Sequence, residues 1–291
     1  MPALPPGVTL LPLAKTSRKT HLKDMLHRLR SLLGPSSAPA APDMSGTTAD
    51  LPHPASTTYV VGDVHGRADL LELMLELIDA HIGGTASTDP QLVFVGDYID
   101  HGPDSAGVLA RLSELTRDFP DNVTCLMGNH ERMLLDFLAD PALRGPRWLR
   151  EGGAATLESF HVHTSDLDAA ADPRAWNEAA RRLSVELGSD TLAWLTARPL
   201  SWSSGNLWAV HAGADPQRAM EDQTARVLLW GHPEFDNSPR GDDIWVAHGH
   251  VERDAPVLAD GRISCDTAAW STGRLSTCAI RSDGSYDFLQ T

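Results

Sequence analysis

The sequence predicts an α/β fold in which a sheet is covered by helices. From residue 58 onward, short apolar runs rich in β-branched residues alternate with stretches of helical periodicity, which is typical of βαβ units. The apolar runs also lead into short polar segments, several of them rich in glycine. Ligands gather at the carboxyl ends of the strands in such sheets, so we expect a functional site where these segments meet.

Five runs have the length and composition of buried strands. They cover residues 59–61, 92–95, 123–127, 207–210 and 244–247. Between the first two runs, the residues Leu70, Met74, Leu77 and His81 recur at helical spacing and predict one face of an amphipathic helix. Residues 134–200 look mostly helical and carry no comparable polar segment. We interpret them as a helical insertion in a catalytic domain that spans residues 58–291.

Composition narrows the class of protein. The chain has 291 residues, of which 42% are hydrophobic and 22% charged, as in a soluble globular protein. No run of about 18 apolar residues predicts a membrane span. The three cysteines are too few and too scattered for a disulfide framework or a zinc cage, so we expect reduced thiols and a cytoplasmic location.

The N-terminal residues 1–57 differ from the rest. All three lysines lie there, so that residues before 35 carry a net charge of +5 and the remainder carries −15 − 5 = −20. Residues 35–56 are rich in Pro, Ala and Ser and are predicted to be a disordered linker. Residues 22–33 could form a basic amphipathic helix that contacts a membrane surface or a partner, or Met25 could be the true start. So acidic a body is a poor partner for nucleic acid.

Five polar segments, each directly after a predicted strand, carry the candidate chemistry. They are 62–66 (GDVHG), 96–100 (GDYID), 128–131 (GNHE), 211–213 (HAG) and 248–250 (HGH). Asp, Asn and His together suit manganese, iron or zinc better than calcium, which prefers oxygen ligands alone. Two cations about 3.5–4 Å apart need a bridging carboxylate and several further ligands. A histidine positioned by a carboxylate could then protonate the leaving group.

In this order, the segments resemble the motifs of the calcineurin-like metallophosphoesterases, and in particular their phosphoprotein phosphatase branch. Further segments resemble the small bacterial and phage members of that branch. They are Trp148-Leu149, Gly152-Gly153, Thr156-Leu157, Leu228-Leu229-Trp230, Asp266-Thr267 and Gly273-Arg274-Leu275. The resemblance covers about residues 58–280. It implies a four-layer α/β/β/α fold and a di-metal centre, for which we expect two divalent ions, manganese first, with iron or zinc as alternatives.

The resemblance also implies a role for individual residues. Asp63 and His65 would bind the first metal, Asp97 would bridge both, and Asn129, His211 and His250 would bind the second. His130 would be the general acid, oriented by Asp100, and a hydroxide bridging the metals would attack the phosphorus. His248 has no counterpart in the family pattern and is left out of this set.

The sequence departs from the family pattern at the substrate phosphate. The family has an arginine where this chain has His101, and the bacterial members usually have a second arginine where it has His232. Histidine is only partly charged near neutral pH. The two replacements could weaken the enzyme, or both histidines could face the phosphate and make activity rise as pH falls, suit a different phosphate group or offer extra metal ligands. Glu151 stands where relatives commonly have asparagine. Arg67 and Arg132 each follow a motif directly; either could replace a missing arginine, but we interpret both as surface residues.

Three functions from two classes remain open from the sequence. The first is a phosphomonoesterase resembling serine/threonine protein phosphatases, acting on a phosphorylated protein, a peptide or a small phosphate ester. The second is a hydrolase of diadenosine tetraphosphate or a related nucleotide. The third is a metal-binding scaffold without catalysis. Asp100 and His130 argue against the scaffold, because a structural metal site has no need of them.

Overall fold

The computed structural model describes residues 51–291, apart from 86, 88, 166 and 168–170. The amphipathic segment predicted at residues 22–33, and nearly all of the N-terminal segment 1–57, lie outside the described residues. The domain boundaries predicted at residues 57, 134 and 200 stay predictions. No helix in the described part of the chain combines the length and apolar character that a bilayer span requires.

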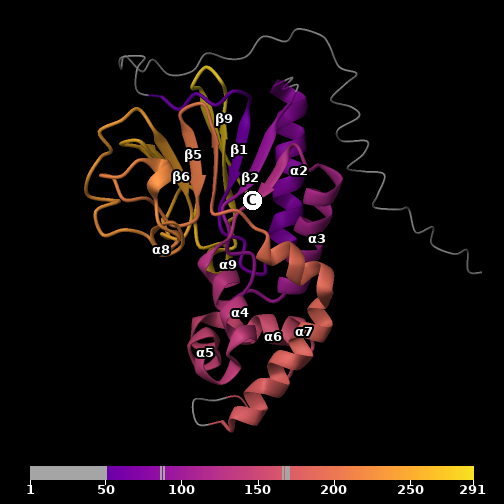
Figure 1. Ribbon diagram of the computed structural model, residues 1–291. Coiled ribbons are helices and arrows are strands. Elements are labelled where there is room, and N and C mark those ends of the chain that lie inside the picture. The colour runs from indigo at the N-terminus through magenta and orange to yellow at the C-terminus, as the bar shows by residue number, and fades with distance from the viewer. Residues whose placement is uncertain (1–50, 86, 88, 166, 168–170) are drawn as a thin grey trace, which may run out of the picture.

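Ten strands in the described residues form two five-stranded sheets (Figure 1). The first sheet has the order β10-β9-β1-β2-β3 and the second has the order β4-β5-β6-β8-β7. The strands of the first are β1 (Thr58–Val61), β2 (Gln91–Phe94), β3 (Val123–Cys125), β9 (Ser276–Ile280) and β10 (Tyr286–Gln290). Those of the second are β4 (Ser201–Ser204), β5 (Leu207–Val210), β6 (Trp245–His248), β7 (Val257–Ala259) and β8 (Arg262–Ser264).

Each sheet contains three neighbouring parallel strands, which lie at one edge of the first sheet and at the centre of the second. In the first, β1 pairs with β2 and β2 with β3, all parallel. In the second, β5 pairs with β6 and β6 with β8, again parallel. The remaining strands β4, β7, β9 and β10 pair antiparallel. Both sheets are therefore mixed, and each gathers three parallel carboxyl ends.

The two sheets face each other across an apolar core. Along β1, Val60 contributes to the core that it shares with Ala209 and Ala247 of the second sheet, while Tyr59 and Val61 belong to the core under the helices. This alternation is the two-residue period of a strand buried on both faces.

Helices cover the outer faces of both sheets. The helices α2 (Ala68–Thr85) and α3 (Ser105–Asp118) lie on the first sheet (Figure 1). The outer face of the second sheet is covered more thinly, by the 3₁₀ turn η2 (Met220–Asp222) and α8 (Ala225–Trp230), whose Met220 and Leu228 pack on Val210 and Val246. The predicted α/β/β/α layering is confirmed.

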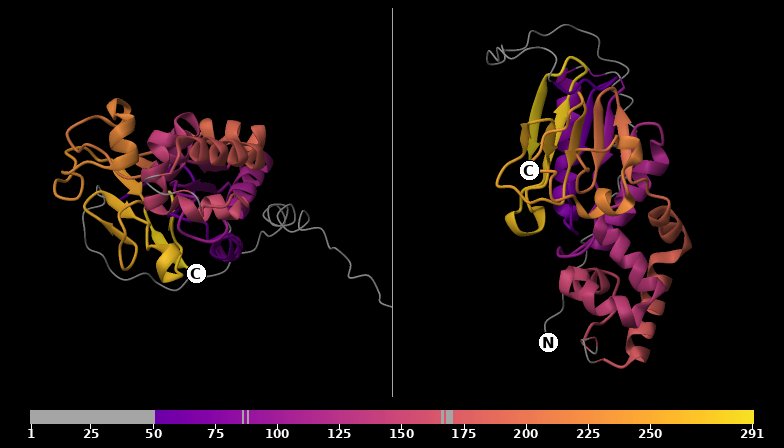
Figure 2. Two further views of the ribbon diagram at one scale, coloured as in Figure 1. Left: turned by 90° about the horizontal axis from the view of Figure 1, so that it is seen from below. Right: turned by 60° about the vertical axis from the view of Figure 1, so that its left-hand side comes forward.

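A group of helices extends beyond the sandwich, at the bottom of Figure 1 and of the right view of Figure 2. It consists of α4 (Asn129–Ala139), α5 (Pro141–Trp148), the π-helical turn η1 (Leu149–Gly153), α6 (Ala154–Ser159) and α7 (Pro173–Thr196). Trp148, Trp176 and Phe137 pack together inside it. A short last helix, α9 (Ala269–Thr272), lies between β8 and β9.

The five strands predicted from the sequence are found within about two residues of their predicted ends, as β1, β2, β3, β5 and β6. The predicted helix is α2, but its buried face differs from the prediction. Leu70, Met74 and Ile78 are buried, whereas Leu77 is 39% exposed. The spacing of the four residues is compatible with two neighbouring faces of the helix. In the fold, the face that carries Leu70, Met74 and Ile78 is the one that packs on the core.

Candidate metal centre

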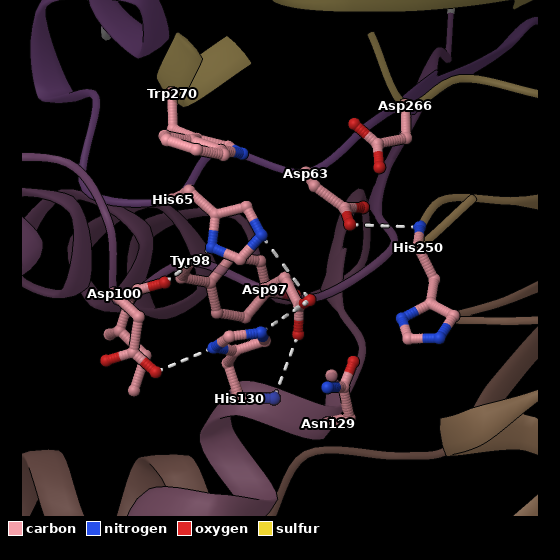
Figure 3. Close-up of polar contacts among 12 residues, drawn as sticks. Asp63, His65, Asp97, Tyr98, Asp100, Asn129, His130, His250, Asp266 and Trp270 are labelled. Atoms are coloured by element: carbon pink, nitrogen blue, oxygen red, sulfur yellow. Dashed lines mark hydrogen bonds and ion pairs between the residues drawn. The ribbon is translucent and has the colours of Figure 1, made fainter. Parts of the chain in front are cut away.

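The predicted site residues lie just after the carboxyl ends of five of the six parallel strands. Asp63 and His65 follow β1, Asp97 follows β2, and Asn129 and His130 open α4 just after β3. From the second sheet, His211 follows β5 and His250 follows β6. Because the two sheets face each other with these ends together, loops almost 190 residues apart in sequence meet, as in the 2.9 Å hydrogen bond from the His250 backbone N–H to Asp63 Oδ2 (Figure 3).

Asp97 stands at the centre of this arrangement. Its Oδ2 lies 3.6 Å from His65 Nε2, while its Oδ1 lies 3.4 Å from His211 Nε2. The two oxygens of one carboxylate thus face histidines on opposite sides. Burial opposes ionisation of Asp97, but the surrounding histidines, His211 foremost, hold its pKa well below its usual range. A buried ionised carboxylate with this orientation suits a ligand that bridges two cations.

The first cluster consists of Asp63, His65 and Asp97. The His65 Nδ1 lies 2.7 Å from the carbonyl oxygen of Ile99, so a proton held there fixes the ring and leaves Nε2 free as a ligand. Asp63 Oδ1 is buried and has no hydrogen-bond partner among the described residues. Burial and the neighbouring Asp266 and Asp97 raise the pKa of Asp63. An orphaned buried carboxylate oxygen is what a metal site without its cation presents.

The second cluster consists of Asp97, His211 and His250, with Asn129 beside them. His211 is completely buried, and its Nδ1 faces the Val95 carbonyl oxygen at 3.1 Å while its Nε2 faces Asn129 Oδ1 at 2.6 Å. Burial lowers the pKa of His211, but Asp97 outweighs it and raises the pKa overall. A cation bound between His211 Nε2 and Asn129 Oδ1 would take the place of a proton on His211 Nε2.

Strained backbone surrounds the two clusters. Among the described non-glycine residues, eight have positive φ, and five of these belong to the site. They are His65, Asp97, Asp100, His101 and His250, with φ between 42° and 72°. Side chains rarely adopt this left-handed region, so the surrounding structure has to impose it. Gly96 permits one such approach, because a Cβ there would overlap the backbone of Gly128.

Glu131 holds the loops of Asp97 and Asn129 together from below. Its Oε2 accepts hydrogen bonds from the backbone N–H groups of Asp97 (2.9 Å) and Gly128 (3.0 Å), and its Oε1 accepts one from Tyr98 (2.8 Å). Burial is the main cause that raises its pKa to about 7. Glu131 is also the N3 residue of α4 and satisfies the start of that helix, as in a capping box.

His130 is held by Asp100 in a buried hydrogen bond. Its Nδ1 lies 2.7 Å from Asp100 Oδ2, which leaves Nε2 facing the cavity, 3.8 Å from Asp97 Oδ2 (Figure 3). Burial favours the neutral ring, but Asp97 and Asp100 outweigh it and raise the pKa of His130 to about 9. A histidine kept protonated in this way can donate a proton.

Asp100 is itself fixed by the helical group. Trp148 Nε1 donates to its Oδ2 at 2.8 Å, and the Thr156 hydroxyl donates to its Oδ1 at 2.6 Å. A Cβ on Gly153 would overlap the Trp148 ring. The Trp, Gly and Thr positions that resemble bacterial and phage relatives are thus the residues that orient Asp100.

A cavity of about 280 Å³ opens above the clusters. Besides predicted ligands, its lining includes His101, Glu151, Trp230, Glu252, Asp266 and Trp270. The His101 ring stacks on Trp270, with centroids 4.6 Å apart and planes inclined by 23°, and it lies edge-on to His65 at 5.0 Å. His101 therefore reaches the cavity, and its contact with substrate stays a prediction.

The structure does not bring His232 to this cavity. It lies 3.9 Å from Asp215 on the second-sheet side and does not line the cavity. Neither neighbouring arginine lines it. Arg67 is bound to Asp69 and to the Ala269 carbonyl, and Arg132 pairs with Asp136.

Three other histidines, His161, His163 and His248, lie outside the metal clusters. His248 is buried and packs on Phe235, with ring centroids 5.0 Å apart. The side chains of His161 and His163 are exposed.

Sequence reasoning missed three residues of the site. Asp266 follows β8, lines the cavity, and has a pKa raised to about 6, first by burial. Its position after a strand and its place in a family-like segment were the available signals. Glu131 was visible only as part of the 128–131 segment. Nothing in the sequence placed Trp270 beside His101.

The fold and the side-chain set are those of a metallophosphoesterase. The family model for calcineurin-like phosphoesterases matches residues 56–280, and the chain belongs to this family. The clusters around Asp97 are consistent with its di-metal centre.

Curated relatives differ in their described activities. A serine/threonine-protein phosphatase 1 of Salmonella typhimurium is 42% identical over 98 residues, 33% of this chain and 38% of the relative. A zinc-dependent endopolyphosphatase of Saccharomyces cerevisiae is 31% identical over 163 residues, 54% of this chain and 46% of the relative. A symmetrical bis(5'-nucleosyl)-tetraphosphatase of Janthinobacterium is 28% identical over 240 residues, 80% of this chain and 70% of the relative. The chain thus spans less than half the length of the first two.

Solved structures share the fold at low identity. A protein provisionally described as a diadenosine tetraphosphatase has a TM-score of 0.54 at 21% identity, with 83% of this chain and 96% of that one covered. A protein serine/threonine phosphatase of Saccharomyces cerevisiae has a TM-score of 0.52 at 16% identity, with 81% and 80% covered. These similarities concern the fold alone.

Proposed function

We propose that this chain is a di-metal phosphomonoesterase that resembles serine/threonine protein phosphatases and acts on phosphorylated proteins, peptides or small phosphate esters. The observation that carries the proposal is the position of Asp97. Its two oxygens face two separate clusters, and the His130–Asp100 pair lies beside it. A site that only bound metal would not need this second pair.

The residues fit two divalent cations. Asp63, His65 and Asp97 would hold the first, and Asp97, Asn129, His211 and His250 would hold the second. The unpartnered Asp63 Oδ1 supports this assignment, because burying a carboxylate oxygen without a partner is costly unless a cation compensates it. Mixed nitrogen and oxygen donors suit manganese, iron or zinc, and we propose manganese first. When bound, the two cations supply an activated water and neutralise phosphoryl charge.

The chain's own residues perform the proton transfer and orient the substrate. His130 Nε2 faces the cavity and would deliver a proton to the leaving alkoxide, while Asp100 keeps the ring oriented and stabilises its charge. His101, on the cavity wall, would donate a hydrogen bond to a phosphoryl oxygen. His232 would contact substrate only from outside this cavity, so we assign the phosphate contact to His101 first.

A nucleotide hydrolase is the second candidate, favoured by the match to a symmetrical bis(5'-nucleosyl)-tetraphosphatase across 80% of this chain. The products separate the two. A phosphomonoesterase releases inorganic phosphate from a phosphopeptide, whereas a symmetrical tetraphosphatase releases ADP from diadenosine tetraphosphate.

The first experiment is p-nitrophenyl phosphate hydrolysis by manganese-loaded protein from acid to alkaline pH, beside Asp97→Asn. Turnover that needs metal and is lost in the variant supports the proposal. If two metals are bound but no phosphate ester is hydrolysed, the proposal is wrong and the non-catalytic metal-binding scaffold is the remaining hypothesis.

A further inference from the structure

We propose that Glu151 and Glu252 make the cavity selective for phosphate monoesters on a cationic carrier, namely a peptide with Arg or Lys beside the phosphorylated residue. The same carboxylates would disfavour polyanionic phosphates. The inference rests on the proposed phosphomonoesterase function and names its class of substrate.

The walls of the cavity hold no permanent positive charge. Within the described part of the chain, its lining includes five carboxylates but neither an arginine nor a lysine. Asp63, Asp97 and Asp266 are buried at the floor, where bound cations would balance them. Glu151 and Glu252 differ, because both are exposed at the rim. Neither forms an ion pair with a described residue, so their charge acts on whatever enters.

Two arginines outside the lining, Arg67 and Arg253, are bound to other groups. Arg67 makes two hydrogen bonds to Asp69 and one to the Ala269 carbonyl, and it lines the adjoining cavity instead. Arg253 pairs with Asp236 at 3.0 Å. The arginine that the family places beside the phosphate is His101 here. The lining itself offers no arginine or lysine to the rim carboxylates, so we assign that role to the substrate.

Trp270 adds a surface suited to such a cation. The residue is 39% exposed, its ring stacks on His101, and its Nε1 donates to Glu252 Oε1 at 3.1 Å. This hydrogen bond places a carboxylate at the edge of an exposed indole. A guanidinium or ammonium group can contact the ring and pair with the carboxylate at once. The chain already shows a comparable contact at the other tryptophan of the cavity, where Arg147 lies 4.9 Å from the Trp230 ring centre.

A chain of phosphates would meet the opposite situation. It would have to extend from the metal clusters over the exposed Glu151 and Glu252, and like charges repel. A phosphopeptide presents one phosphate to the metals and its side chains to the rim. Basic side chains there gain attraction where a second phosphate meets repulsion.

The test uses phosphoserine peptides of one length whose neighbours are Arg, Gln or Glu. The value of kcat/KM is measured for each with manganese-loaded full-length protein, with E151Q, with E252Q and with both together. Glutamine keeps the shape of the side chain and its hydrogen-bond acceptor while removing the charge. The control is E186Q, which removes the same charge from the exposed surface of α7.

We expect the wild type to rank the peptides Arg over Gln over Glu. Each cavity substitution should reduce the Arg-to-Glu ratio by about two- to fivefold, the double variant by the product, and E186Q should leave it unchanged. The ratio should also fall with added salt. An unchanged ratio in the double variant, with p-nitrophenyl phosphate still hydrolysed, overturns the inference and leaves the phosphomonoesterase intact.

Equilibrium binding of the same peptides, with a phosphonate in place of the phosphate, gives a readout that does not depend on turnover. If binding keeps the ranking and the double variant loses it, the selectivity stands even where catalysis fails. If the Glu-flanked peptide binds as tightly as the Arg-flanked one, the inference is wrong.

Discussion

Replacing Asp100 with asparagine isolates the proposed proton donor. Asp100 is fully buried and accepts hydrogen bonds from His130 Nδ1 at 2.7 Å, from Trp148 and from Thr156. The substitution keeps the shape but removes the charge that stabilises protonated His130. A charge-assisted hydrogen bond is worth about 1.5–3 kcal/mol, which corresponds to a rate loss of roughly 10- to 150-fold.

The loss should depend on the leaving group. A seryl or alkyl oxygen departs poorly without a proton, so kcat for a phosphoserine peptide should fall by the full factor. p-Nitrophenolate leaves readily unprotonated, so its kcat should fall by a few-fold at most. The assay compares both substrates at saturating concentration, with metal content measured for each protein. W148F is the matched control, since it removes one hydrogen bond to Asp100 and no charge.

Equal losses on both substrates would refute the reasoning, provided that two metals remain bound. Asp100 would then act on the metals or on substrate binding, and His130 would not be the proton donor.

Other predictions concern the metals and the fold. Asp97→Asn should lose metal from both clusters together, seen as a fall from two bound ions towards none by elemental analysis; loss of one ion alone would contradict the bridging role. Chelation of wild type should abolish phosphate release, and added manganese should restore it. Glu131→Gln should lower the free energy of unfolding by about 1–3 kcal/mol in urea, because the new amide group faces a backbone N–H that the carboxylate satisfied; an unchanged midpoint would contradict this. Burial opposes ionisation of Asp287, but Arg281 and then His81 outweigh it and lower its pKa. Its contribution to stability is therefore present above the unfolded pKa of about 3.9 and is lost as pH falls through the folded value. Asp287→Asn should cost at most about 1 kcal/mol at neutral pH, since the carboxylate is half exposed, and the difference from wild type should vanish at low pH.

Much of the fold and site follows from local sequence. Each central strand is an apolar run that ends in a polar turn, and parallel strands bring their carboxyl ends to one edge. Asp63, Asp97 and His211 were therefore placed correctly relative to their strands, although the sequence alone could not separate bridging from terminal ligands. Four of the unpredicted strands, β4, β7, β9 and β10, pair antiparallel, and the fifth, β8, has only three residues and offers no period to detect.

Local sequence could not predict which residues tertiary packing brings to the cavity. His101 and His232 were paired by one argument, yet only His101 reaches the cavity. The helix α8 ends at Gly231, whose φ of 79° turns the chain, and His232 then lies near Asp215. Trp270 reaches the cavity from α9, which the sequence did not predict. Its neighbour His101 comes from a loop about 170 positions earlier, and their stacking depends on how the two sheets pack.

The left-handed backbone at His65, Asp97 and His250 also affects the stability of the protein before it binds metal. Each such residue costs of order 1–3 kcal/mol, a large fraction of the stability of an ordinary domain. Cations that bind only the folded state would repay that deficit by mass action. The newly made chain should therefore be most vulnerable to proteases and aggregation while metal is scarce. Its abundance in a cell would then report on metal supply before its activity did.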